Sequence, residues 1–356
     1  MKPALSRDDV ASMDEAGGGW RDLPECQDLA AEWQALEAQA DGSPFHSWGW
    51  VSTWLRHLPA NVVPRVFRAY DAQGVLALAL AVEKPEGWPV RVFGRASLLL
   101  QETGIASVDE VSIEYTGLLA RRGGEDAAYR VLFSTLQRQW AGWRRFRLTA
   151  TADAQRIAAC LPASLRGYSV YQAPAYYVDL AALRARGGSH AASLGRNARH
   201  NLGQTRRAYE VHGPLRVEEA GDTGTALAWL DALRVLHERR WQARGKAGAF
   251  ASPFFGAFHR DFVQRHHAGG LVQVARVSAG PLPVAYLYNL QWQGTLYFYN
   301  CGLNYGAVPR YDSPGALGRS VFIQHALEAG YAAFDFLAGE QDYKRRLATG
   351  QRTLDW

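Results

Sequence analysis

Residues 296–337 read LYFYNCGLNYGAVPRYDSPGALGRSVFIQHALEAGYAAFDFL, and this stretch decides the fold. It opens with aromatic and apolar residues typical of a strand, passes through a loop rich in Gly and Pro, and continues into a helix. A second apolar strand closes the stretch at Tyr331–Leu337. A strand, a helix and another strand in this order predict a crossover unit of an α/β fold.

The start of the helix in this stretch is suited to binding an anion. Ser313 is a favourable N-cap, and the proline after it fits the first helical position. Gly315 and Gly318 remove side chains where a ligand could approach the backbone. Free N–H groups and the helix dipole attract a phosphate or pyrophosphate, which Arg310 or Arg319 could assist. Many helices that bind nothing begin in the same way, and that alternative stays open. The candidate anion-binding residues are Ser313, Pro314, Gly315, Ala316, Leu317 and Gly318.

The chain has 356 residues, which is more than one hydrophobic core usually organises, so we expect two domains. Residues 1–22 are polar and end near a run of three glycines, which predicts a flexible tail. An N-terminal α/β domain is expected over 23–174 and a C-terminal α/β domain over 175–356. Both halves repeat a coarse order of helices, a strand hairpin, a helix and a strand. In the first half helices are expected at 28–39 and 127–140, a hairpin at 62–70 and 75–83, and a strand at 146–150. In the second half helices are expected at 193–209, 225–243, 252–267 and 313–329, and strands at 175–180, 271–277, 284–292, 295–301 and 331–337.

Composition excludes several classes of protein. The chain is 48% hydrophobic with a formal net charge of +5, which describes an ordinary globular protein and does not by itself indicate DNA binding. Three scattered cysteines and ten histidines without ligand spacing predict neither a disulfide framework nor a metal site. The first residues lack the apolar core of a signal peptide, and no apolar run reaches the roughly 20 residues of a membrane span. We therefore expect a cytoplasmic protein.

A set of short motifs in fixed order carries a resemblance to a known family. In the second half these motifs are SLGRNARHNLGQTRRAYE, LHERRW, FASPFFGAFH, PVAYLYNL, LYFYNCGLN, the Ser-Pro-Gly helix start and FDFLAGEQDYKRRLAT. The run from about Ser189 to Lys344 resembles the GNAT-related acyltransferases of the CelD cellulose-biosynthesis type, which are relatives of the FemABX aminoacyl ligases. The N-terminal half resembles them more loosely, through PFHSWGWVSTWLRH and DEVSIEYTGLL.

The resemblance implies a tandem pair of GNAT-like domains, each a mixed β-sheet flanked by helices, of which the C-terminal one is catalytic. It implies transfer of an acyl group from acyl-CoA to an amine of a sugar, polysaccharide precursor or small metabolite, with the pyrophosphate at residues 313–318. The sequence lacks the usual Q/R-x-x-G-x-G/A loop in strict form, so two alternatives stay open. One is a FemABX-like ligase that takes its donor from aminoacyl-tRNA, and the other is a binding module without catalysis.

Four residues are candidates for the chemistry. Asp335 alternates with two phenylalanines along its strand, so it either faces a cleft as a base or caps a nearby turn. By the resemblance, Tyr343 matches a tyrosine that protonates the leaving thiol, and Lys344 matches a lysine that meets substrate phosphate. His237 lies on the apolar face of its helix, where a packed core histidine is the commoner case.

Five further residues are candidates for substrate binding: Arg196, Arg199, Trp241, Asn289 and Tyr299. Arg196 and Arg199 form a basic helical stripe with His200 and Arg207, which could steer an anionic substrate or simply be a solvated face. Asn289 and Tyr299 belong to two neighbouring expected strands, where polar aromatic side chains either line a pocket or complete the core.

Overall fold

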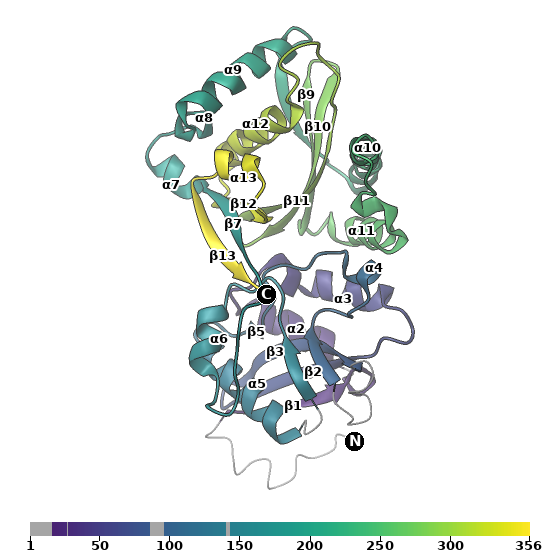
Figure 1. Ribbon diagram of the computed structural model, residues 1–356, viewed down its shortest axis with the longest axis vertical. Coiled ribbons are helices and arrows are strands. Elements are labelled where there is room, and N and C mark those ends of the chain that lie inside the picture. The colour runs from purple at the N-terminus through teal and green to yellow at the C-terminus, as the bar shows by residue number, and fades with distance from the viewer. Residues whose placement is uncertain (1–15, 27, 86–95, 140–142) are drawn as a thin grey trace. The chain divides into compact units, whose positions relative to one another are not determined.

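The computed structural model describes residues 16–26, 28–85, 96–139 and 143–356. It divides into two compact units, Met1–Gln172 with Leu354–Trp356, and Ala173–Thr353 (Figure 1). The expected division lay at 174/175 and left residues 354–356 in the second domain. In the structure these residues belong to the first unit, because the backbones of Thr151 and Asp355 exchange hydrogen bonds in both directions, each 2.9 Å long.

The predicted tail, residues 1–22, is only partly covered by the structure, since residues 1–15 lie outside the described part. Gly17–Asp22 differ from the prediction and form β1, paired antiparallel with β2 (Pro64–Asp71). The glycines permit this because a Cβ on Gly18 would lie 2.6 Å from Cγ1 of Val131. Trp20, which is 8% exposed, then anchors the strand in the core. The glycine run is therefore an edge strand packed closely on a helix.

The first unit contains a six-stranded mixed sheet, in the order β1-β2-β3-β4-β6 with β5 paired to β3. The predicted hairpin is confirmed as β2 and β3, which meet at Asp71 and Gly74. The other strands are β3 (Gly74–Pro85), β4 (Ala96–Leu100), β5 (Leu119–Ala120) and β6 (Trp143–Arg147). The helices are α2 (Leu29–Glu37), α3 (Trp48–His57), α4 (Ala106–Asp109), α5 (Glu125–Gln139) and α6 (Ala154–Cys160), with short 3-10 turns η1 (Leu23–Glu25) and η2 (Pro44–His46).

Helices cover both faces of this sheet, as the alternation of β2 requires. Phe67 and Ala69 point into the core that includes residues of α5. Arg68, between them, points to the opposite face, where its guanidinium pairs at 2.6 Å with Glu32 of α2. The first unit is thus a three-layer arrangement of helix, sheet and helix.

The second unit contains a seven-stranded sheet in the order β13-β7-β12-β11-β10-β9-β8. Its strands are β7 (Gln172–Asp179), β8 (Leu215–Glu219), β9 (Val272–Ala279), β10 (Leu282–Trp292), β11 (Thr295–Leu303), β12 (Ala333–Ala338) and β13 (Gly350–Asp355). Its helices are α7 (Leu180–Ala185), α8 (His190–Ser193), α9 (Arg196–Glu210), α10 (Thr223–Gln242), α11 (Pro253–His266), α12 (Pro314–Glu328) and α13 (Asp342–Leu347), with the 3-10 turn η4 (Ala249–Ala251). The helices and strands predicted in this half are confirmed to within a few residues at their ends.

Two glycines allow helices to approach this sheet closely from its two faces (Figure 1). On one face α10 lies against β11, where a Cβ on Gly302 would meet the backbone of Leu233 at 2.5 Å. On the other face α12 lies against β10, where a Cβ on Gly318 would meet Cβ of Ala285 at 2.7 Å. Gly318 therefore serves helix–sheet packing rather than the approach of a ligand, which corrects one reason given for its place in the anion site.

Each unit contains one connection of the same type, which joins two parallel strands through a helix. In the first, the chain runs from β4 through α4, β5 and α5 to β6, which lies parallel to β4. In the second, β11 is followed by α12 and then by β12, which lies parallel to β11. The other recorded strand pairs are antiparallel. The predicted pair of mixed α/β domains is therefore confirmed.

Candidate active site in the second unit

The two parallel strands at the centre of the second sheet pair over only a short distance. Their ladder consists of three residue pairs and ends where Tyr297 of β11 faces Asp335 of β12. In β11 the register against β10 shifts between Phe298 and Asn300, so Tyr299 is the extra residue of a bulge. In β12 the register against β7 shifts after Asp335 as well. Both strands leave regular pairing at the same level, next to the start of α12.

Asp335 shapes this point of the sheet. Its carboxylate accepts a hydrogen bond of 2.7 Å from the amide of Leu337, whose φ is +62°, and it lies 3.8 Å from the guanidinium of Arg352. Its side chain is 1% exposed, and its neighbours Phe334 and Phe336 are equally buried. Alternation did not separate a cleft face from a core face, because β12 is a central strand covered on both sides. This hydrogen bond agrees with the second of its two predicted roles, the capping of a turn, and a role in the chemistry stays a prediction.

The start of α12 differs from the predicted anion cradle. The side chain of Ser313 makes no capping hydrogen bond. The amides of Ala316 and Leu317 both donate to the carbonyl of Ser313 at 3.1 Å, so they are engaged within the helix. Pro314 and Gly315 are buried. An anion here would depend on side-chain donors more than on these amides.

Arg319 supplies such donors. Its side chain folds back toward the helix start, where one guanidinium nitrogen donates to the carbonyl of Gly315 at 3.0 Å and the other lies 3.3 Å from Sγ of Cys301. The guanidinium also lies over the rings of Tyr343, at 3.9 Å, and Phe298, at 5.1 Å. The residue is 6% exposed, and its Nε atom has no hydrogen-bond partner. No carboxylate among the described residues lies within 4 Å of it, so Arg319 is a buried cation without a counter-ion.

Tyr343 and Lys344, adjacent on α13, point in different directions. Tyr343 packs beneath Arg319 and edge-on to Phe336, and burial raises the pKa of its hydroxyl to about 12. Lys344 is 6% exposed, and its ammonium donates to the carbonyls of Leu337 and Ala338 at the end of β12. Lys344 therefore holds the end of β12, and its contact with an anionic substrate stays a prediction, while Tyr343 packs against the buried cation Arg319.

His237 and Trp241 interact with each other on α10. The indole N–H of Trp241 donates to Nε2 of His237 at 2.8 Å, so the imidazole carries its proton on Nδ1. Burial lowers the pKa of His237, and its ring packs edge-on against Phe250. A Cβ on Gly248 would lie 2.6 Å from the ring. The contacts of His237 and Trp241 hold η4 against α10. His237 is thus packed within the fold, as in the commoner of its two predicted roles.

The sequence does not single out His259, a fully buried histidine of the second unit. His259 of α11 is fully buried, with Nδ1 at 3.0 Å from the hydroxyl of Tyr288 and Nε2 at 3.2 Å from the hydroxyl of Tyr299. Burial lowers its pKa to about 3, so the ring is neutral. Asn289 is also fully buried and donates to Gln273 at 3.1 Å, on the sheet rather than at a pocket. The signal that could have revealed His259 is its place among phenylalanines in FASPFFGAFH, a setting in which an imidazole needs partners.

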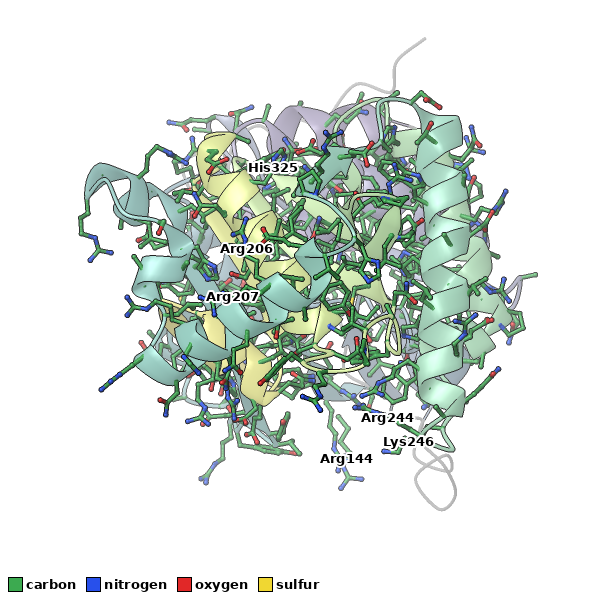
Figure 2. All side chains as sticks on the ribbon, turned by 90° about the horizontal axis from the view of Figure 1, so that it is seen from above. Arg144, Arg206, Arg207, Arg244, Lys246 and His325 are labelled. Carbon is green, nitrogen blue, oxygen red and sulfur yellow. The ribbon has the colours of Figure 1, made fainter. Side chains whose placement is uncertain are left out.

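The basic stripe of α9 is on the surface. Arg196, Arg199, His200 and Arg207 are exposed, and Arg206 is paired with Glu210 at 2.8 Å. Figure 2 shows Arg206 and Arg207 on this helix. Arg244 and Lys246, just beyond the end of α10, are exposed as well (Figure 2). Arg196 and Arg199 are therefore free to meet a solvent-borne anion but take no part in the buried site around Arg319.

In the described ranges, no cluster of three or more His, Cys, Asp or Glu side chains could hold a metal ion. Within the same part of the chain, none of the helices combines the length and the apolar character of a membrane span.

Comparison with known proteins supports the reading of the second unit. Residues 196–345 match the family described as Acetyltransferase (GNAT) domain, so this segment is similar to GNAT-type acetyltransferase domains. No curated protein matches the chain in sequence.

Solved structures extend the likeness to both units. FemX has a TM-score of 0.57 at 10% identity, covering 92% of this chain and 94% of its own. The C-terminal DUF2156 domain of a protein described as a lysylphosphatidylglycerol synthetase from Agrobacterium fabrum has a TM-score of 0.51 at 14% identity, covering 91% and 90%. L-PGS from Bacillus licheniformis has a TM-score of 0.51 at 15% identity, covering 91% and 89%. At these identities the likeness concerns the fold, which is a tandem of GNAT-like domains.

Proposed function

We propose that the chain is a cytoplasmic N-acyltransferase that takes an acyl group from acyl-CoA and transfers it to an amine, with its active site in the second unit. The acceptor would be an amine of a sugar, a polysaccharide precursor or a small metabolite, as the resemblance to the CelD type implies. The observation that carries the proposal is Arg319 beside the start of α12, a buried guanidinium that no carboxylate of the described residues approaches within 4 Å.

An uncompensated buried cation is unfavourable by several kcal/mol unless a ligand neutralises it. A phosphate group would do so, because guanidinium donates paired, charge-assisted hydrogen bonds to phosphate oxygens. The free Nε of Arg319 offers one such donor without breaking a contact already made. The pyrophosphate of CoA fits this need, and the bulge at Tyr299 and the parted strands beside it would receive the pantetheine and acyl groups.

The corresponding helix of the first unit argues for the same assignment by contrast. The helix α5 occupies the place of α12 in its own sheet but begins with Glu125 and Asp126. The carboxylate of Glu125 accepts a hydrogen bond of 3.2 Å from the amide of Gly123. Acidic groups in the first turn repel an anion, and one of them already occupies an amide. The first turn of α12 has no acidic residue. We therefore assign CoA binding to the second unit alone.

In the reaction, the neutral amine would attack the thioester carbonyl, the C–N bond would form, and the C–S bond would break to release CoA thiolate. By the resemblance, Tyr343 is the residue that would meet that thiolate, and it packs against Arg319. With a pKa of about 12 it is a far weaker acid than a thiol, whose pKa is near 8.5. We therefore propose that Tyr343 stabilises the thiolate by donating a hydrogen bond, and that the proton lost by the amine passes to solvent.

Calorimetric titration with CoA and acetyl-CoA tests the proposal. We expect saturable binding of both, and acetyl transfer to at least one primary amine when acceptor panels are followed by thiol release. Absence of heat and of thiol release with acetyl-CoA and with longer acyl-CoAs would contradict it.

A second candidate function is ligation with aminoacyl-tRNA as the donor, as in the FemABX ligases that the sequence resembles. The exposed cations on α9 and beyond α10 favour it, because basic side chains on a surface bind the phosphates of a nucleic acid. The salt dependence of binding distinguishes the two functions. Binding of tRNA would weaken steeply between about 50 and 200 mM salt, whereas binding of CoA at a buried guanidinium would change little.

A further inference from the structure

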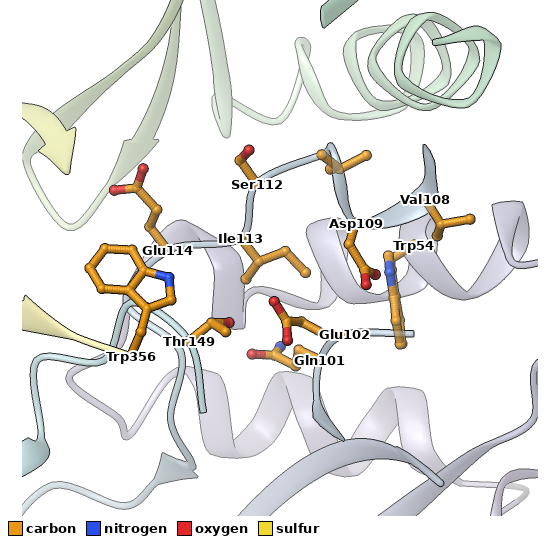
Figure 3. Close-up of a pocket in the computed structure, with 11 residues that line it drawn as sticks. Trp54, Gln101, Glu102, Val108, Asp109, Ser112, Ile113, Glu114, Thr149 and Trp356 are labelled. Atoms are coloured by element: carbon orange, nitrogen blue, oxygen red, sulfur yellow. The ribbon is translucent and has the colours of Figure 1, made fainter. Parts of the chain in front are cut away.

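The first unit contains a cavity of about 220 Å³ that no part of the acyl-transfer proposal uses (Figure 3). All of its lining residues belong to the first unit. They are Trp54, Gln101, Glu102, Val108, Asp109, Val111, Ser112, Ile113, Glu114, Thr149 and Trp356. The volume is below the range of about 300–1,000 Å³ typical of drug-sized ligands, so it suits a small molecule or the end of a longer one.

The lining carries three carboxylates and no basic side chain. Asp109 is engaged in the wall, where it accepts hydrogen bonds from the amides of Thr103 at 2.8 Å and Gly104 at 2.7 Å. Glu102 is mostly buried and lies 3.4 Å from the guanidinium of Arg147, which is itself 60% exposed in its side chain. With three carboxylates and no basic side chain in its lining, the cavity favours a cation over an anion.

Gln101 provides an independent sign of a ligand. Its side chain is 3% exposed, and its Nε2 donates to the carbonyl of Phe45 at 3.2 Å. This bond fixes the amide orientation, because the flipped amide would face one oxygen with another. The Oε1 atom is then left buried in the lining without a hydrogen-bond partner. A buried acceptor of this kind requires a donor, so the missing group carries N–H or O–H.

Two indoles stand at opposite sides of the cavity. Figure 3 shows Trp356 beside Glu114 on one side and Trp54 on the other, with Glu102, Gln101 and Thr149 between them. The faces of indole rings attract cations, and a low-polarity wall strengthens that attraction. The indole walls, the carboxylates of the lining and the buried acceptor thus all favour a cation that carries N–H donors.

The backbone around the cavity is also strained. Four non-glycine residues of this region have a positive φ, a conformation that L residues rarely adopt. They are Gln101 at 51°, Ser112 at 46°, Tyr115 at 55° and Ala150 at 49°. Strain of this kind persists where the fold holds side chains in a required position.

We propose that this cavity binds a small organic cation with N–H donors, a primary ammonium or a guanidinium, between Trp54 and Trp356. The cation pairs with Glu102 and Glu114 and donates a hydrogen bond to Oε1 of Gln101. The proposal is independent of acyl transfer, because each of these residues lies in the first unit.

The test is calorimetric titration of the full chain with 1,5-diaminopentane, and with 1,5-pentanediol as the uncharged ligand of similar shape. We expect saturable binding of the diamine at low salt and at least tenfold weaker binding of the diol. Glu102→Gln keeps the shape of the side chain and removes its charge, and it is expected to raise the Kd of the diamine about tenfold or more.

Glu110→Gln is the matched control, because Glu110 is exposed on the same segment and does not line the cavity. The Kd of Glu110→Gln for the diamine is expected to stay within about twofold of the wild-type value. If Glu102→Gln fails to unfold cooperatively, Glu114→Gln takes its place with the same expected loss. The proposal is overturned if the wild type binds no diamine, if the diol binds equally well, or if the folded cavity variant retains wild-type affinity.

Discussion

Replacing Arg319 with methionine should weaken binding of acyl-CoA while leaving the fold as stable as before, or more stable. Methionine fills a similar volume and packs well against Tyr343 and Phe298. The variant loses the hydrogen bond to Gly315, the contact with Cys301 and the attraction of the two rings, about 1–3 kcal/mol together. It also removes a buried charge without a counter-ion, whose desolvation costs several kcal/mol.

The loss in binding follows from the bonds that Arg319 would make to phosphate. Hydrogen bonds to charged groups contribute about 1.5–3 kcal/mol, which corresponds to a Kd roughly 10- to 150-fold higher. At a ligand concentration of about 100 times the wild-type Kd, the wild type gains about 2.7 kcal/mol of stability. A variant with a Kd about 30-fold higher gains only about 0.9 kcal/mol under the same conditions.

Thermal unfolding with and without acetyl-CoA measures both quantities in one experiment. Arg216→Met is the control, because Arg216 is exposed on the edge strand β8 and its replacement removes the same charge from the protein. We expect the ligand to raise the Tm of the wild type and of Arg216→Met by several degrees, and that of Arg319→Met by much less. An equal rise in all three proteins would refute the role of Arg319. A large loss of stability in Arg319→Met without ligand would show that the guanidinium belongs to the fold rather than to a ligand.

Three further predictions concern single residues. Tyr343→Phe should lower kcat/KM about 10- to 100-fold in thiol-release assays with little change in Tm, since it removes one donor to the thiolate; unchanged kcat/KM would exclude Tyr343 from the chemistry. Gly318→Ala should lower the free energy of unfolding by about 1–3 kcal/mol in urea titrations, because its Cβ would lie 2.7 Å from Ala285, whereas Gly256→Ala, with open space around its Cβ, should not destabilise; equal stability of both variants would disprove the close packing. His259 is neutral in the fold with a pKa of about 3, and in the unfolded chain its pKa is near 6.5, so stability due to this neutral state is present above pH 6.5 and declines as pH falls toward 3. The free energy of unfolding of the wild type should therefore fall more steeply between pH 6 and 4 than that of His259→Gln, by about 1.4 kcal/mol per pH unit, and identical slopes would show that this histidine is charged in the fold.

Most of the fold could be predicted because its signals are local. The hairpin at Asp71–Gly74 and the crossover around α12 are encoded by turn residues and by periodicity within a few positions. The glycines at 17–19 were misjudged as a tail, because a glycine run also suits an edge strand under a helix, and only the distant Val131 decides between the two. Long-range packing therefore limits what the local pattern can predict.

The candidate site was harder to predict for the same reason. Alternation leaves open whether Asp335 faces a cleft or caps a turn, because whether a strand is central depends on partners such as β7 that are more than a hundred residues away. Arg319 was considered only as an assistant to backbone amides. That it is buried without a carboxylate follows from α13 and β11 together, and no single segment reveals it. The hydrogen bonds of His259 likewise join three separate elements.

The position of Leu354–Trp356 in the first unit has a consequence for biosynthesis. During translation, roughly 200 residues must emerge after Thr151 before its partner Asp355 exists, and closing so long a loop is slow. The indole of Trp356, one wall of the cavity in Figure 3, arrives with the same segment. The first unit of a ribosome-bound nascent chain would therefore stay incomplete until the second unit has been synthesised. During that interval its apolar surface would be accessible to chaperones.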